Sequence, residues 1–157
     1  MAGEIRLKPH HLVDIVMALG AGQERFQPHP YGHAVHTVAH RVLGDSGTVM
    51  RIELGADDIC QPCRHNIQGA CDDRIDNSWC PRAPSSKRLW NLRLDRRWCR
   101  RLGLRRGDRL TVGEFFRLLR QRAGDLADIY REIPTDRVAI RAENLRRGLD
   151  RLLGSGS

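Results

Sequence analysis

The sequence predicts a mostly helical α+β fold, with about five to six helices, one short strand or small sheet and a cysteine-rich loop. Three observations predict this fold. Several stretches repeat apolar residues at helical spacing, one stretch alternates apolar and polar residues, and four of the five cysteines gather within residues 57–81. The length of 157 residues suits a single domain, expected over residues 1–153, with residues 154–157 as a flexible tail.

The first helix is expected over residues 8–20, because a proline suits its first turn and a glycine suits its end. Its apolar residues recur on one face: Leu12, Ile15, Val16 and Leu19. His10 and Asp14 share a different face, and His11 lies between the two faces. His10 and Asp14 are therefore either a surface pair or a proton-transfer or ligand pair aimed into a pocket.

A second helix is expected over about residues 30–43, ended by Gly44. Four histidines would then share one helical stripe: His29, His33, His36 and His40. Such a stripe is either a solvated polar face or a proton-responsive or second metal site. Residues 48–54 alternate apolar and polar side chains, which predicts a half-buried strand that leads into the cysteine loop.

The cysteine loop carries the strongest chemical signal in the chain. Its cysteines are Cys60, Cys63, Cys71 and Cys80. Because two residues separate Cys60 from Cys63, one tight turn can present two thiolates to one metal or cluster. Cys71 and Cys80 follow far enough along for the chain to loop back, and Pro81 follows the last cysteine, as in bacterial ferredoxin runs that end in Cys-Pro.

Three kinds of link could use these cysteines. Disulfides are disfavoured because the cysteine number is odd and the first residues lack the apolar core of a signal peptide, which indicates a cytoplasmic protein with reduced thiols. Structural zinc usually takes two short cysteine pairs, whereas Cys71 and Cys80 are widely separated. An iron–sulfur cluster needs one tight pair and outlying cysteines, so a [4Fe-4S] cluster is preferred and zinc is the alternative.

Acidic residues surround the cysteines: Asp57, Asp58, Asp72, Asp73 and Asp76. Their charges would disfavour the more negative reduced state of a cluster and so lower its reduction potential. The alternative interpretation is that these carboxylates cap turns in a solvated loop.

The second half of the chain is predicted to be helical and basic. Helices are expected over residues 85–102, 112–123, a short segment ending at Ile133, and about 135–153, with a serine cap on the first and a Thr111–Glu114 capping box on the second. Residues 82–157 hold 20 basic and 9 acidic residues, whereas residues 1–81 hold 7 and 10. The positive charge therefore concentrates in the second half.

The helix over residues 85–102 has an expected basic face formed by four arginines: Arg93, Arg96, Arg97 and Arg100. Asp95 falls among the apolar positions, where a carboxylate needs a partner, and an arginine is expected to supply it. Cys99 is expected to be a small core residue.

The segment K-P-H-H-L near the N-terminus, followed by a short strand and then D-D-I-C, resembles a little-characterised family of small bacterial proteins. Members of that family typically begin R-P-H-H-L-L-C, carry an acidic D-D-I-C segment and are regarded as cysteine-rich iron–sulfur-binding proteins of unknown function. The resemblance covers roughly residues 5–81. It implies that Pro9, His10 and His11 belong to the working site.

This chain departs from the family at one position, because Asp14 stands where the family tends to have cysteine. Either the role of that cysteine has passed to Cys71 or Cys80, or Asp14 supplies an oxygen ligand to one iron. The resemblance leaves both ligand sets open.

The sequence thus predicts an iron–sulfur protein with a polar pocket of His10, His11 and Asp14, performing redox or Lewis-acid chemistry on a small substrate. Four cysteine ligands would favour electron transfer with a redox partner, and three would leave one iron open. The competing class is a zinc-stabilised, arginine-rich nucleic-acid-binding module. At most weak, non-specific nucleic-acid binding is expected, and no apolar run approaches the ~20 residues that a membrane span requires.

Overall fold

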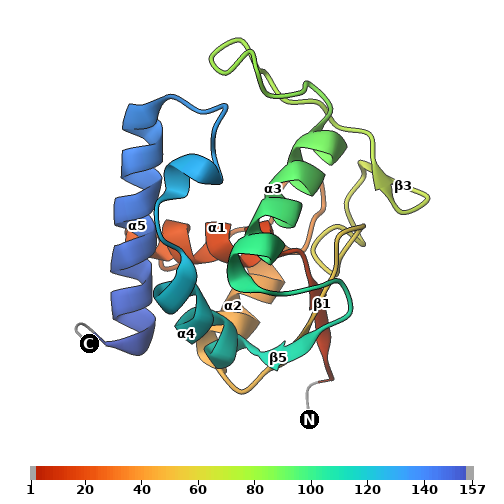
Figure 1. The fold of residues 1–157 in the computed structure, drawn as a ribbon. Coiled ribbons are helices and arrows are strands. Elements are labelled where there is room, and N and C mark those ends of the chain that lie inside the picture. The colour runs from red at the N-terminus through yellow and green to blue at the C-terminus, as the bar shows by residue number, and fades with distance from the viewer. Residues whose placement is uncertain (1–2, 155–157) are drawn as a thin grey trace.

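The computed structural model describes residues 3–154. Within them the chain forms five α-helices, one 3-10 helix and two small sheets, which confirms the predicted, mostly helical α+β fold (Figure 1). The predicted tail lies outside the described residues except for Gly154. Among the described residues, no helix combines the length and the apolar character that crossing a membrane requires.

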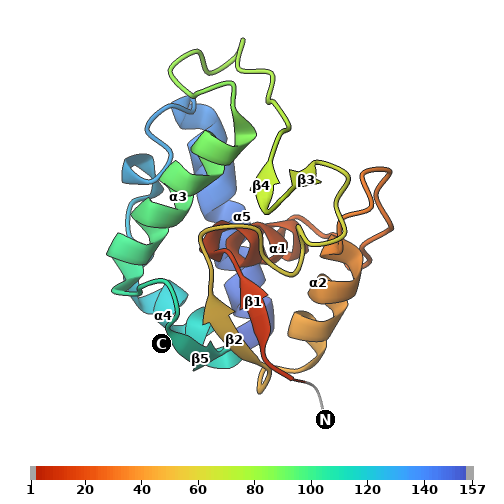
Figure 2. The same cartoon turned by 90° about the vertical axis from the view of Figure 1, so that its right-hand side faces the viewer.

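The larger sheet has the strand order β1-β2-β5, formed by Ile5–Leu7, Val49–Ile52 and Arg109–Thr111. Strand β1 runs parallel to β2, and β5 runs antiparallel to it (Figure 2). Only β2 was predicted, because three-residue strands are too short to display a periodicity. Strand β1 matters for the site, since it delivers the chain directly into the first helix.

Helix α1 (Pro9–Gly20) is mostly buried and packs against both α5 (Thr135–Leu153) and α3 (Lys87–Leu102). The approach of α1 to α5 is close enough to require glycine. A Cβ atom on Gly148 would overlap the carbonyl oxygen of Val16, and one on Gly20 would overlap that of Asn144. This packing holds the start of α1 at a fixed place in the core.

Helix α2 spans Val35–Gly44, so its predicted start near residue 30 is wrong. The preceding segment contains two prolines and Gly32, whose φ of +76° lies in the left-handed region, and these residues keep the chain out of a helix. His29 and His33 therefore precede α2, where their rings stack with centroids 4.4 Å apart, and only His36 and His40 lie on the helix. The four histidines do not share one helical stripe.

The long helices of the second half begin and end close to where local signals predict, whereas the short helix predicted to end at Ile133 is only a 3-10 helix that ends at Asp128. Ser86 caps α3 by accepting a hydrogen bond from the Leu89 backbone, and Gly103 ends it in the left-handed conformation. The capping box of Thr111 and Glu114 begins α4 (Val112–Arg122). The 3-10 helix η1 (Leu126–Asp128) follows, and α5 then begins directly after a proline.

The cysteine segment is mostly irregular. After β2 the chain makes a series of tight turns and then a hairpin of β3 (Asn66–Ile67) and β4 (Ala70–Cys71). Gln68 and Gly69 form its tip with positive φ angles of 53° and 85°. A long loop over residues 72–86, beyond the tip of α3 in Figure 1, then returns the chain to that helix.

Candidate functional site

Asp57 joins the start of α1 to the turn that carries the first cysteines. Its carboxylate is fully buried. Oδ2 accepts hydrogen bonds from the Lys8 backbone at 2.8 Å and from His11 Nδ1 at 2.7 Å, and Oδ1 accepts from the backbones of Ile59 and Cys60 at 3.1 and 3.0 Å. Burial alone would raise the pKa of Asp57, but His11 and the backbone donors hold it well below its usual value.

Asp58 makes the corresponding link to β1. One of its carboxylate oxygens accepts from the Arg6 backbone at 2.9 Å, and the other accepts from Arg6 Nε at 3.2 Å. The segments K-P-H-H-L and D-D-I-C are therefore held against each other by two consecutive aspartates. Both carboxylates accept backbone hydrogen bonds, as the capping interpretation predicts, but Asp57 is fully buried and not in a solvated loop.

His10 has a carboxylate partner of its own. Asp95 on α3 is fully buried, and its oxygens accept from His10 Nδ1 at 2.9 Å and from the His10 backbone at 2.7 Å. The expected arginine partner of Asp95 is therefore wrong. Burial alone would lower the pKa of His10, but the negative charge and hydrogen bond of Asp95 outweigh it and raise the pKa above its ordinary value.

These two pairings fix how both histidine rings can act. Because a carboxylate occupies each Nδ1, the Nε2 atoms of His10 and His11 are left for a ligand or a proton, and neither Nε2 makes a hydrogen bond within residues 3–154. The ring centroids lie 4.3 Å apart. A carboxylate behind a histidine ring is the usual arrangement in metal-ligating histidines, where it fixes the tautomer and strengthens the ligand.

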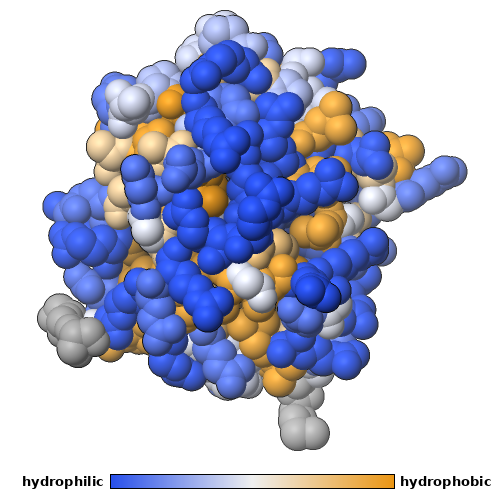
Figure 3. All heavy atoms as spheres, viewed as in Figure 1, coloured by the Kyte–Doolittle hydropathy of each residue, from blue (hydrophilic) through white to orange (hydrophobic). Residues whose placement is uncertain are grey.

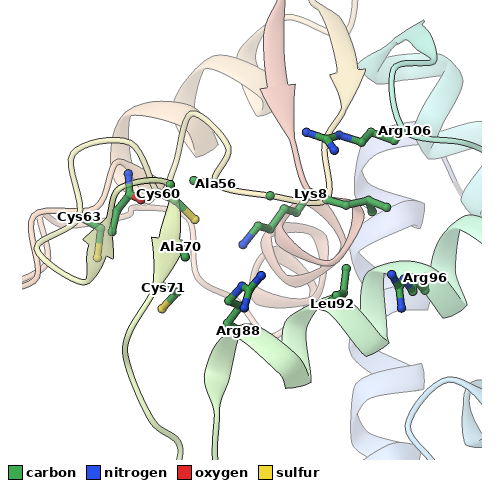
Figure 4. Close-up of a pocket in the computed structure, with 14 residues that line it drawn as sticks. Lys8, Ala56, Cys60, Cys63, Ala70, Cys71, Arg88, Leu92, Arg96 and Arg106 are labelled. Carbon is green, nitrogen blue, oxygen red and sulfur yellow. The ribbon is translucent and has the colours of Figure 1, made fainter.

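Three of the predicted cysteine ligands line the same cavities. Cys60 and Cys63 belong to one turn, closed by a 2.9 Å hydrogen bond from the Cys63 backbone to the Cys60 carbonyl, and Cys71 lies on β4 (Figure 4). All three are free thiols. Burial, and then the charge of Asp57, raise the pKa of Cys60 to about 11. A metal that binds this thiol must therefore displace its proton.

The three thiols stand between two cavities. The histidine cavity, of about 280 Å³, is lined among others by His10, His11, Asp14, His33, His65, Trp90 and Asn91. The arginine cavity, of about 270 Å³, is lined among others by Leu92, Arg88, Arg96 and Arg106. Lys8, Cys60, Cys63 and Cys71 line both cavities. Any group held by the thiols is thus within reach of imidazoles on one side and of cations on the other.

Asp14 lies at the edge of this arrangement. Its side chain is 52% exposed and forms an ion pair with Arg141 at 3.8 Å, at the border of the histidine cavity. His10 donates its hydrogen bonds to Asp95 and not to Asp14, although the charge of Asp14 also helps to raise the pKa of His10. The predicted His10–Asp14 pair therefore lines one cavity without a hydrogen bond between the two side chains.

The structure does not bring Cys80 to the other three cysteines. It is buried in the loop of residues 72–86 and lines neither cavity. The charged groups that act on it are Asp76, Arg137 and Glu132, whereas Asp57 and Lys8 act on Cys60. Cys99 is buried on α3 in the hydrophobic core, as predicted.

One compact donor group is present within residues 3–154, formed by His11, Asp57 and Cys60, whose ligand atoms lie within 4.8 Å of one another. These three residues could hold a metal ion. Because Asp57 already accepts four hydrogen bonds, its carboxylate serves mainly to orient its neighbours. Soft thiol sulfurs beside imidazole nitrogens are a donor set suited to zinc or to an iron–sulfur cluster.

The basic face predicted on α3 is divided between two roles. Arg97 and Arg93 bind Glu132 at 2.7 and 2.8 Å and so fasten α3 to the segment before α5. Arg96 lines the arginine cavity. The face of the molecule seen in Figure 1 is largely hydrophilic, with smaller hydrophobic patches between (Figure 3). Part of the positive charge thus stabilises the fold.

Comparisons of the chain with protein-family models, curated proteins and solved structures found no match. The donor groups and the two cavities therefore carry the functional assignment. Sequence reasoning missed Lys8 and Asp95. The signal for Asp95 was its place among apolar positions of α3, and the signal for Lys8 was its place next to the histidine pair.

Proposed function

We propose that the protein binds an iron–sulfur cluster, preferably [4Fe-4S], through Cys60, Cys63 and Cys71. The observation that carries this proposal is the placement of these three thiols on the wall common to both cavities. Of the three, only Cys60 belongs to the compact donor group. A cubane spans a larger gap than a single ion, so three more widely spread thiols suit a cluster better. The resemblance of K-P-H-H-L and D-D-I-C to an iron–sulfur-binding family points the same way.

A cluster held by three thiolates supplies an iron with an open position, which acts as a Lewis acid or binds a substrate atom. The chain itself would contribute the two histidines. Asp95 and Asp57 hold the rings of His10 and His11 through Nδ1, so each Nε2 can donate or accept a proton inside the histidine cavity. Trp90 and Leu94 line the same cavity and restrict water around a bound molecule.

This arrangement favours a small-molecule substrate over simple electron transfer. An electron-transfer site needs no cavity lined by oriented histidines, whereas a substrate site does. The cluster could also transfer electrons to the same bound substrate, which is the redox version of this proposal.

A single zinc ion is the second candidate, favoured by the compactness of His11, Asp57 and Cys60. A zinc ion requires four donor atoms, each roughly 2.0–2.3 Å from the metal. Asp57 could be one of these donors only by giving up a hydrogen bond. The broader alternative of a zinc-stabilised nucleic-acid-binding module gains less support, because Arg93 and Arg97 bind Glu132.

The two candidates separate in one experiment. Protein purified without oxygen is analysed for iron, acid-labile sulfide and zinc. The proposal expects a brown protein with iron and sulfide in similar amounts and little zinc. Stoichiometric zinc without sulfide would replace the cluster by the second candidate.

A further inference from the structure

Lys8 is a mostly buried residue that lines both cavities, and within the described residues its ammonium group has no carboxylate partner. The residue is 5% exposed, and its Nζ makes no hydrogen bond or ion pair within the described residues. The buried carboxylate of Asp57 binds the backbone N–H of Lys8 rather than its ammonium group, and it also binds His11 and the turn of Cys60. An ammonium group that reaches a cavity without a carboxylate beside it attracts an anion into that cavity.

A second cation converges on the same space. Figure 4 shows the ammonium group of Lys8 and the guanidinium group of Arg88 pointing toward one another beside Cys60 and Cys71. Arg88 has no hydrogen-bond or ion-pair partner within residues 3–154 and lines the arginine cavity. Two cations that face each other repel unless an anion lies between them.

Two further arginines line the rest of the arginine cavity. Arg96 lies two helical turns beyond Arg88 on α3, on the same face. Arg106 lies before β5 and binds Glu53 through Nε at 2.9 Å, which leaves its terminal nitrogens for a ligand. Among the described residues that line this cavity there is no aspartate or glutamate.

We propose that the arginine cavity is a binding site for a phosphate group of a small molecule, seated between Lys8 and Arg88. Four cations without an acid in the lining favour a doubly charged phosphate over a single carboxylate, and guanidinium groups match phosphate oxygens in geometry. Small residues, among them Ala56 and Ala70, leave room beside the thiols, and the volume of about 270 Å³ fits a molecule somewhat larger than the phosphate itself.

The buried position of Lys8 favours a small molecule over a macromolecule. An acidic protein surface or a nucleic-acid backbone would meet the exposed arginines Arg88, Arg96 and Arg106, but a group must enter the cavity to reach the ammonium of Lys8. Because Cys60, Cys63 and Cys71 also line this cavity, the rest of the molecule would extend toward the proposed cluster. The phosphate site itself does not depend on which group the thiols hold.

Isothermal titration calorimetry with inorganic phosphate, on the purified full-length chain at low ionic strength, tests the proposal. Saturable binding is expected, with affinity reduced at least about tenfold by Lys8→Met and about three- to tenfold by Arg88→Gln. Arg117→Gln on α4 removes an equal charge from an exposed position outside the cavity and should change the affinity less than about twofold. Arg88 is exposed, so its replacement tests the site even if Lys8→Met fails to fold.

Absence of saturable phosphate binding would overturn the proposal, as would equal losses in Arg88→Gln and Arg117→Gln, since that result would reflect net charge alone. The proposal would also be overturned, in favour of nucleic acid, if the Arg88 and Lys8 variants lost more affinity for a single-stranded oligonucleotide than for phosphate. The Cys63→Ser variant separates this inference from the proposed function. It should lose iron and sulfide but still bind phosphate.

Discussion

His11 and Asp57 are joined by a 2.7 Å hydrogen bond from Nδ1 to Oδ2, although 46 positions separate them in the sequence. The same carboxylate oxygen accepts the backbone N–H of Lys8, and the other oxygen closes the turn that presents Cys60. A single buried side chain thus sets the position of a histidine, a lysine backbone and a thiol relative to one another.

Replacing Asp57 by asparagine should therefore damage both the fold and the metal site. The asparagine amide has one acceptor oxygen, and its NH2 group would face N–H donors that now bind a carboxylate oxygen. The free energy of unfolding, measured in urea, should therefore fall by about 2–4 kcal/mol. The iron content per chain should fall as well, because the turn of Cys60 and the ring of His11 lose their common support.

Asp58→Asn is the matched control for that variant. Asp58 is partly exposed, and within residues 3–154 its carboxylate binds only Arg6, so a loss below about 1 kcal/mol is expected, with iron content retained. If both variants had the same stability and iron content as the original protein, Asp57 would not organise the site.

Glu132 should make stability depend on acid pH. Hydrogen bonds from Arg97 lead the causes that lower the pKa of Glu132 to about 2, below the ordinary 4.5. A lowered pKa in the folded state contributes stability that is complete above about pH 4.5 and is lost as the pH falls through about 2. The contribution is roughly 3 kcal/mol.

Urea unfolding of the original protein and of Glu132→Gln, measured at several pH values, tests this linkage. The difference in unfolding free energy should be largest near neutral pH and should shrink toward zero between about pH 4.5 and 2. A difference that stays constant over that range would show that the ion pair with Arg97 and Arg93 does not shift the titration of Glu132.

The contact between α1 and α5 gives a prediction about packing. Alanine usually favours a helix over glycine by up to about 1 kcal/mol, but at Gly148 the new Cβ would overlap the backbone of Val16. Gly148→Ala should therefore lower the unfolding free energy by about 1–3 kcal/mol. Gly44→Ala, at the end of α2 with open space around it, should be neutral or slightly stabilising. Thermal unfolding of both variants decides, and equal melting temperatures would contradict the close approach.

Local signals explain how much of the fold could be predicted. The caps at Ser86 and Thr111 and the left-handed Gly103 act within one helical turn, so the sequence predicts α3 and α4 nearly residue by residue. Strands β1 and β5 were missed because their pairing partners lie far along the chain. A strand of three residues is defined by its neighbours rather than by its own pattern.

The site shows the same division between local and distant information. The pair Cys60–Cys63 is local, and its spacing predicts a shared turn. The partner of Asp95 lies 85 positions away at His10, a distance over which no spacing rule operates. Cys80 was predicted as a fourth ligand from cysteine number and the following proline, yet neither observation can tell where a long loop carries it.

The iron and acid-labile sulfide content of single-cysteine variants, purified without oxygen, tests the central claim most directly. Cys60→Ser, Cys63→Ser and Cys71→Ser should each lose most of both elements, whereas Cys80→Ser and Cys99→Ser should keep them with an unchanged visible spectrum. Loss of the cluster in Cys80→Ser, with retention in Cys71→Ser, would contradict the three-thiol site. Equal retention in all five variants would exclude a cluster held by these cysteines.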